Sequence, residues 1–178
     1  MDRFIAIELS GARVHLAIHP VTAGEYKRFL HETGRPIPRG LKQIHSAVAP
    51  VVDVSQADAV AYCAWLGGQT GRTLRLPSMA ELHDLMTDED GDALDAGLWP
   101  HQQGHLTELR GGMKPIHLCE WTRDTVEGPR YGDRPPRILA DIFYPPWLRD
   151  GSNVGHVHAS LAAEQGFAFV TFRLAYDG

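Results

Sequence analysis

Hydrophobic and polar residues alternate along two short runs near the start of the chain, residues 3–9 and 13–18. Alternation of this kind is typical of strands with one buried face. The residues between the two runs, Ser10-Gly11-Ala12, are small and favour a turn. We therefore expect the chain to open with an antiparallel hairpin.

Three later segments repeat hydrophobic residues at helical spacing. The first has an N-cap residue at Thr22 and stops at Gly34. The second has its N-cap at Ser55, and the pair Gly67-Gly68 is expected to end it. The third begins at Pro77-Ser78. The pattern thus predicts two or three amphipathic helices.

The second half of the chain has a different character. Beyond about residue 97 it is rich in Gly, Pro and aromatic residues, and its hydrophobic runs are short. These runs are Ile116–Cys119, Ile138–Ala140 and Phe167–Ala175. We interpret this half as irregular loops held by a few strands.

Composition predicts a single domain, residues 1–178. The 178 residues, 43% of them hydrophobic, suffice for one buried core but not for two linked domains. A formal net charge of −5, with scattered arginines, argues against a nucleic-acid partner. Charged residues at the N-terminus and the lack of a run of ~20 apolar residues argue against a signal peptide and a membrane span. We expect a cytoplasmic protein with no membrane partner.

Five short motifs follow one another along the chain. They are His19-Pro20-Val21-Thr22, Pro50-Val51-Val52, Gly71-Arg72 with Leu74-Arg75-Leu76-Pro77-Ser78, Glu120-Trp121-Thr122, and Phe172-Arg173-Leu174-Ala175. In this order they resemble the formylglycine-generating (sulfatase-modifying) enzyme family. The resemblance implies an α+β, C-type-lectin-like fold that is rich in loops, with two or three helices and a small twisted antiparallel sheet. That family includes oxidases and binding proteins, so the resemblance alone does not fix the function.

Within the motifs, two tryptophans and two arginines are expected to have structural roles. Trp65 and Trp121 are large apolar anchors with one N–H each to satisfy. Arg75 and Arg173 carry planar guanidinium groups that can tie loop carbonyls or carboxylates together. We expect these four side chains to fix the loops rather than to catalyse a reaction.

The oxidases of the family bind copper through two cysteines near the last strand, where thiolates favour a soft metal. This chain has two cysteines, Cys63 and Cys119, and none after position 119. Neither matches a copper-binding position of the family, and both are expected to be buried, reduced thiols. The sequence therefore argues against copper-dependent conversion of cysteine to formylglycine.

Histidines offer a different metal site. If residues 155–160 form a strand, His156 and His158 project from one face, as a chelate for iron or copper requires, and His117 is a candidate third ligand. The alternative is that these histidines lie on a surface strand and bind no metal. Calcium is not expected, because His117 replaces an asparagine that helps to hold it in the family.

Aromatic and arginine residues of the C-terminal half are candidates for a ligand-binding surface. Aromatic faces together with guanidinium groups suit a peptide or a small anionic or planar ligand. The candidates are Tyr131, Tyr144, Trp147, Arg137 and Arg149.

Two functions follow from these observations. The favoured hypothesis is a catalytically reduced member of the family, without a cofactor, that acts as a binding or accessory module for a peptide, a protein or a small ligand. The alternative is an oxidase with a histidine-ligated iron or copper ion. The sequence leaves open the identity of the partner and the oligomeric state.

Overall fold

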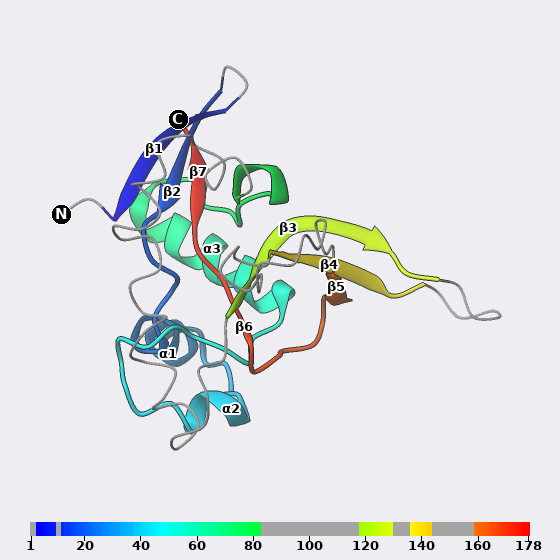
Figure 1. Ribbon diagram of the computed structural model, residues 1–178. Coiled ribbons are helices and arrows are strands. Elements are labelled where there is room, and N and C mark those ends of the chain that lie inside the picture. Colours follow the sequence, from blue (N-terminus) through cyan, green and yellow to red (C-terminus); the bar gives the residue numbers. More distant parts are fainter. Residues whose placement is uncertain (1–2, 10–11, 83–117, 130–135, 144–158) are drawn as a thin grey trace, which may run out of the picture.

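The computed structural model describes residues 3–9, 12–82, 118–129, 136–143 and 159–178. A three-stranded antiparallel sheet contains both ends of the chain (Figure 1). Strands β1 (Phe4–Leu9) and β2 (Ala12–Ala17) pair with each other, and β7 (Ala175–Asp177) pairs with the other edge of β2. The predicted N-terminal hairpin is therefore confirmed.

Helix α1 (Ala23–Thr33) follows the predicted pattern closely. Thr22 and Glu25 form a reciprocal capping box at its start, which satisfies two backbone N–H groups. Gly34 ends the helix in the left-handed conformation, with φ of 67°. A short helix, α2 (Arg39–Lys42), lies in the connection after α1, where no helix was predicted.

Helix α3 (Gln56–Thr70) begins at the Ser55 cap, as predicted, but runs three residues beyond Gly67. The prediction that Gly67-Gly68 ends it was wrong. Gly71, with φ of 67°, ends the helix instead. Gly67 is small for a packing reason, since a Cβ there would lie 2.6 Å from the backbone oxygen of Arg72. Glycine in a helix interior costs only about 1 kcal/mol, which the rest of α3 can offset.

A further helical turn starts at Met79, after a second capping box. The Ser78 hydroxyl accepts a hydrogen bond from the Glu81 backbone N–H at 3.1 Å, and the Glu81 carboxylate accepts one from the Ser78 backbone N–H at 2.7 Å. The structure describes this helix as far as Leu82 and confirms its predicted start at Ser78. None of the described helices is long and apolar enough to cross a bilayer.

The second sheet has the order β5-β4-β3-β6. Strand β3 (Cys119–Glu127) pairs antiparallel with β4 (Ile138–Phe143), and β4 pairs antiparallel with β5 (Ala159–Ala162). The short β6 (Val170–Thr171) is parallel to β3. The α+β class is confirmed, but the strands form two sheets and one pair is parallel. Figure 1 shows β3 and β4 projecting from the body as a long curved hairpin.

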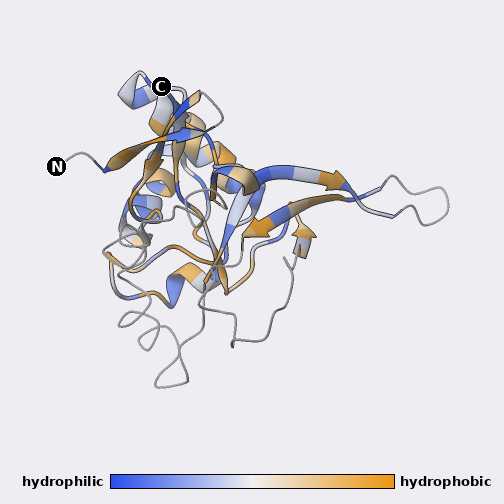
Figure 2. Ribbon diagram, turned by 45° about the horizontal axis from the view of Figure 1, so that its top comes forward, coloured by the Kyte–Doolittle hydropathy of each residue, from blue (hydrophilic) through white to orange (hydrophobic). Residues whose placement is uncertain are grey.

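Aromatic side chains form the centre of the core between the helices and the last strands. The rings of Tyr62 and Phe172 have centroids 5.6 Å apart, and those of Phe29 and Tyr62 lie 5.5 Å apart, both pairs edge to face. Tyr26 completes the cluster, and all four side chains are buried. Figure 2 shows that the helices and strands carry both hydrophobic and hydrophilic residues, as expected of elements with one buried face.

Candidate functional site

Two long segments, residues 83–117 and 144–158, are attached to the four-stranded sheet at neighbouring positions. Ile142 pairs with Ala159, so residues 144–158 leave and re-enter the sheet at neighbouring positions. Phe143 pairs with Glu120, three residues after the segment 83–117 ends. Leu82, where that segment begins, lies in the same hydrophobic cluster as Phe143. Both segments are thus attached to the scaffold around Phe143.

These two segments carry most of the candidate site residues. Tyr144, Trp147, Arg149, His156, His158 and His117 all lie outside the described residues, as does Tyr131. Strand β5 begins at Ala159, directly after His158. The ligand-binding and metal-binding roles of these residues stay predictions.

Arg137 is the one candidate that the structure describes, and it lies away from Phe143. It is exposed and its carbonyl accepts a hydrogen bond from Gly128 at 2.8 Å, at the tip of the β3–β4 hairpin. Phe143 is six residues further along β4, or about 20 Å at the rise of a strand. The hairpin therefore separates Arg137 from the edge where the two long segments are attached.

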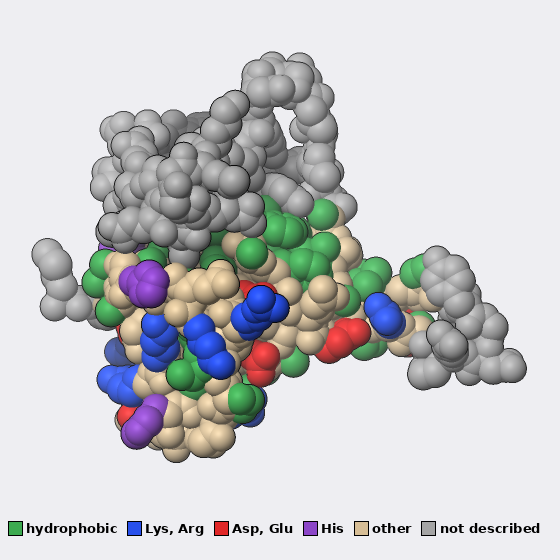
Figure 3. Space-filling view, turned by 90° about the horizontal axis from the view of Figure 1, so that it is seen from below, with side chains coloured by type: hydrophobic (Ala, Val, Ile, Leu, Met, Phe, Trp, Pro, Cys, Tyr) green, Lys and Arg blue, Asp and Glu red, His purple; other side chains and the backbone are tan. Residues whose placement is uncertain are grey.

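A row of aromatic side chains borders that edge. Trp121 is buried on β3, and its ring centroid lies 6.1 Å from that of Phe167, which lies 5.8 Å from Phe169. Phe167 and Phe169, together with Leu161 of β5, are only partly buried. Figure 3 shows hydrophobic side chains gathered near the base of the hairpin on this side of the molecule. This row offers apolar surface to a ligand beside the start of β5.

The sheet edge is held in place by a buried ion pair. Arg173 donates to Glu120 through Nε at 2.6 Å and through Nη2 at 2.5 Å. Its Nη1 also donates to the carbonyls of Ala17 and Ile18, at 3.2 Å and 3.3 Å. One guanidinium group therefore joins β3 to the end of β2, which confirms the structural role predicted for Arg173.

Two further hydrogen bonds fix the start of β3 against α3. Trp121 donates from Nε1 to the carbonyl of Val54 at 2.9 Å, and Gln56 donates from Nε2 to the carbonyl of Thr122 at 2.8 Å. Trp121 thus satisfies its polar group as predicted. Trp65 packs differently, with its ring 5.4 Å from Tyr62 and 5.3 Å from the guanidinium of Arg28.

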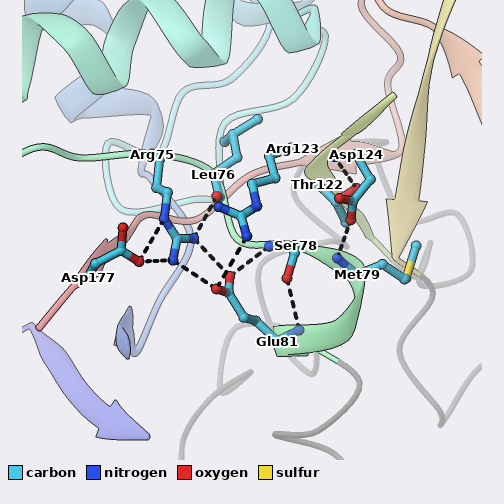
Figure 4. A network of polar contacts seen from close by, with 9 residues as sticks. All are labelled: Arg75, Leu76, Ser78, Met79, Glu81, Thr122, Arg123, Asp124 and Asp177. Atoms are coloured by element: carbon cyan, nitrogen blue, oxygen red, sulfur yellow. Dashed lines mark hydrogen bonds and ion pairs between the residues drawn. The ribbon is translucent and has the colours of Figure 1, made fainter. Parts of the chain in front are cut away.

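Arg75 is the centre of a second polar network, drawn in Figure 4. Its Nη1 and Nη2 each donate to the Glu81 carboxylate at 2.8 Å, and it also contacts Asp177 of β7. Arg123 of β3 approaches the same carboxylate at 4.0 Å. Asp124 accepts a hydrogen bond from the Met79 backbone N–H at 2.6 Å. The network ties the last strand, the helix at Met79 and β3 together, which confirms the predicted structural role of Arg75.

These contacts shift two carboxyl pKa values. Burial alone would raise the pKa of Glu81, but the hydrogen bonds from Arg75 and from the Ser78 backbone outweigh it and hold that pKa below its ordinary value. The hydrogen bond from Arg75 likewise lowers the pKa of Asp177. Both carboxylates are ionised at neutral pH, so this network has no proton to offer as a general acid.

The thiols do not fit the copper site of the family's oxidases. Cys63 lies on α3 and Cys119 begins β3, and both are buried in the core without forming a disulfide. Burial raises the pKa of Cys63 to about 12. A copper site of this kind needs two accessible thiolates, and the chain has no other cysteine. Within the described ranges, no cluster of three or more His, Cys, Asp or Glu side chains could hold a metal ion.

Sequence reasoning missed the partner of Arg173 and the partly exposed phenylalanines. Glu120 interrupts the apolar run from Leu118 to Trp121, and Arg173 interrupts the run from Val170 to Ala175. Opposite charges inside two apolar runs are a signal for a buried pair, which the sequence analysis did not use. Phe167 and Phe169 carried no such signal, because a single sequence does not show which alternating residue stays partly exposed.

Comparison with known proteins supports the fold and the family resemblance. Residues 8–84 match the sequence model described as "Sulfatase-modifying factor enzyme 1-like domain". The solved structure of PvdO from Pseudomonas aeruginosa is similar with a TM-score of 0.60 and 19% sequence identity, over 93% of this chain and 81% of that one. The crystal structure of CarF is similar with a TM-score of 0.59 and 15% identity, over 93% of this chain and 87% of that one.

No protein of curated function matches the chain. At these identities the two solved structures establish the fold and not the activity. Together they confirm the predicted C-type-lectin-like fold, and the match over residues 8–84 supports the resemblance to the formylglycine-generating enzyme family that the motifs indicated.

Proposed function

We propose that this chain is a catalytically reduced member of the family that binds a peptide, a protein or a small ligand as an accessory module. The binding surface lies where the segments 83–117 and 144–158 are attached to the four-stranded sheet. The observation that carries this proposal is their common attachment around Phe143. The preceding residue of β4, Ile142, lies in the core cluster against which the partly exposed Phe167 and Phe169 pack.

The scaffold under this surface suits recognition rather than redox chemistry through thiols. Buried pairs such as Arg173–Glu120 fix the sheet edge, so a loop attached there starts from a rigid base. Both cysteine side chains are buried in the hydrophobic core. Aromatic side chains beside a rigid edge can bury a partner's apolar groups at low entropic cost.

The β4–β5 register gives a direct test. Because Ile142 and Ala159 are paired, a short Asn-Gly turn can replace residues 144–158 and still connect the two strands. The matched control replaces residues 130–135 at the other end of the hairpin, where Glu127 pairs with Ile138. Both variants and the unchanged chain are screened against one displayed library of random peptides.

We expect selected peptides to bind the unchanged chain and the 130–135 replacement, and to lose at least ten-fold in affinity for the 144–158 replacement. Peptides that bind all three proteins equally would contradict the proposed surface. A library that yields no binder at all would contradict peptide recognition.

The alternative function is an oxidase with iron or copper held by His156, His158 and His117. It is supported by the position of the His156/His158 pair in the sequence, directly before β5. Elemental analysis of untagged protein, with the His156→Ala/His158→Ala variant as control, tests it. Near-stoichiometric metal that is lost in the variant would favour the oxidase, and metal-free folded protein would contradict it.

A further inference from the structure

One face of the three-stranded sheet carries a group of rings that the proposed binding surface does not include. His15 of β2 and Tyr176 of β7 are direct cross-strand partners, and their rings stack at 4.4 Å with an interplanar angle of 1°. Phe4 of β1 meets Tyr176 edge to face at 5.0 Å. We call Phe4, His15 and Tyr176 the aromatic shelf, and all three side chains are partly exposed.

Arg72 lies over this shelf. Its guanidinium carbon is 4.8 Å from the ring centroid of Tyr176 and 5.7 Å from that of Phe4. Both distances are within the range of a cation–π contact. The side chain is nevertheless exposed.

The backbone holds Arg72 in this position. Gly71 turns the chain at the end of α3 with φ of 67°, and the Arg72 N–H donates to the carbonyl of Gly67 at 3.2 Å. The missing side chain of Gly67 leaves room for the Arg72 backbone oxygen. Gly67 and Gly71 therefore fix the backbone at Arg72, which reduces the conformational entropy lost when this arginine binds a ligand.

Among the described residues, Arg72 differs from its neighbours in having no polar partner for its guanidinium group. Neighbouring arginines are neutralised, since Arg3 pairs with Glu25 at 2.8 Å and Arg13 pairs with Glu8 at 2.7 Å. Arg72 makes no side-chain hydrogen bond or ion pair with any residue that the structure describes. A guanidinium that contacts two rings, and whose N–H groups bond to none of the described residues, offers the fork that a carboxylate accepts.

We propose that Arg72 and the aromatic shelf form a binding site for an aromatic carboxylate. The carboxylate accepts hydrogen bonds from the edge of Arg72, and the aromatic group packs against the exposed parts of the shelf. Such a group can belong to a free organic acid or to an acidic segment of a protein flanked by aromatic residues. The site lies on the three-stranded sheet, so it does not depend on the function proposed for the four-stranded sheet edge.

The test uses the full chain and follows the ring proton signals of Tyr176 by NMR during titration with benzoate. Acetate and benzamide are the matched probes, since one lacks the ring and the other lacks the charge. The peptide acetyl-Phe-Asp-Phe-amide represents the protein source. Arg72→Gln removes the charge, Arg72→Lys keeps the charge without the fork, and Arg39→Gln removes an exposed arginine of α2 that makes no ring contact.

We expect benzoate to shift the Tyr176 signals saturably, with a dissociation constant below about 10 mM, and Arg72→Gln to weaken binding roughly ten-fold or more. Arg72→Lys should weaken it less, Arg39→Gln should leave it unchanged, and benzamide and acetate should bind more weakly than benzoate. Tighter binding of the peptide than of benzoate would identify a protein segment as the source.

Three results would overturn the proposal. They are the absence of a saturable shift below about 10 mM, equal binding by the unchanged chain and by folded Arg72→Lys and Arg72→Gln, and equal binding of benzoate and benzamide. Unfolding curves of each variant show whether it is folded. If Arg72→Gln does not fold, Arg72→Lys and the benzamide comparison still decide the question.

Discussion

Arg173 and Glu120 form a doubly hydrogen-bonded ion pair with both side chains fully buried, although Glu120 lies in β3 and Arg173 lies between β6 and β7. Removing one member of such a pair leaves a charge without its partner in the interior. We predict that Arg173→Met lowers the free energy of unfolding by about 3–5 kcal/mol, measured by urea denaturation.

The control for this prediction is Arg137→Met, because Arg137 is exposed at the tip of the hairpin. A change within about 0.5 kcal/mol is expected there. The double variant Arg173→Met/Glu120→Leu should lose less stability than the sum of the single changes, because it leaves neither charge alone. Additive losses would show that the two side chains do not depend on each other.

Glu81 should make stability depend on pH in the acid range. Its pKa is lowered in the folded state, so the unfolded state binds the proton more readily. The contribution is therefore fully present above the unfolded pKa of about 4.3 and is lost as the pH falls through the lower folded value. We predict that Glu81→Gln destabilises the protein by about 1–3 kcal/mol at pH 7 and by less at pH 3.

Urea denaturation at several pH values checks this prediction. The difference between the unchanged chain and Glu81→Gln should shrink below about pH 4.5. A difference that stays constant down to pH 3 would mean that the Arg75 network does not lower the pKa of Glu81.

The two glycines at the end of α3 should respond oppositely to alanine. Gly71 has φ of 67°, which an alanine adopts only with strain, so Gly71→Ala should destabilise by about 1 kcal/mol. Gly68 is helical and exposed, with open space around the position of a Cβ, so Gly68→Ala should stabilise by about 0.5–1 kcal/mol. Thermal unfolding measures both, and equal signs would contradict the assignment of the helix end.

Thiol labelling tests the burial of the cysteines. With a pKa of about 12, only on the order of one Cys63 in ten thousand is a thiolate at pH 8. We predict that an aromatic disulfide reagent leaves Cys63 unmodified in the native protein and modifies it in denaturant. Rapid native labelling of Cys63 would show an accessible thiol and would reopen the case for thiol chemistry.

Local sequence patterns predicted most of the described helices and strands in the N-terminal half of the chain. Thr22 and Ser55 were predicted as N-caps, and each accepts the expected backbone hydrogen bond. The third helix begins after Ser78, as predicted, and Ser78 caps it. Helix caps can be predicted from the sequence because they depend on residues only three or four positions away. The end of α3 was predicted at the wrong residue because Gly67 does not end the helix. A glycine is needed there because the backbone of Arg72, which lies outside the helix, packs against it.

The C-terminal half was predicted only in outline, because its strands pair with distant partners. Nothing in the sequence of β6 shows that it lies parallel to β3. The charges of Glu120 and Arg173 within apolar runs indicated a buried pair, but this signal was not used. The candidate ligand residues were grouped by closeness in sequence, and the β3–β4 hairpin separates Arg137 from Phe143 by the length of a strand. Residues that are six positions apart in sequence lie about 20 Å apart along a strand, so closeness in sequence does not by itself place side chains in one site.

The position of β2 between β1 and β7 also bears on how the chain folds. The first sheet stays incomplete until the last strand has been synthesised, because β7 comes from the opposite end of the sequence. Closing so large a loop costs entropy before any contact is gained. A nascent chain that has not yet exposed β7 therefore leaves one edge of β2 without its neighbour, and we expect folding of this domain to finish late and slowly compared with that of a helical protein of equal size.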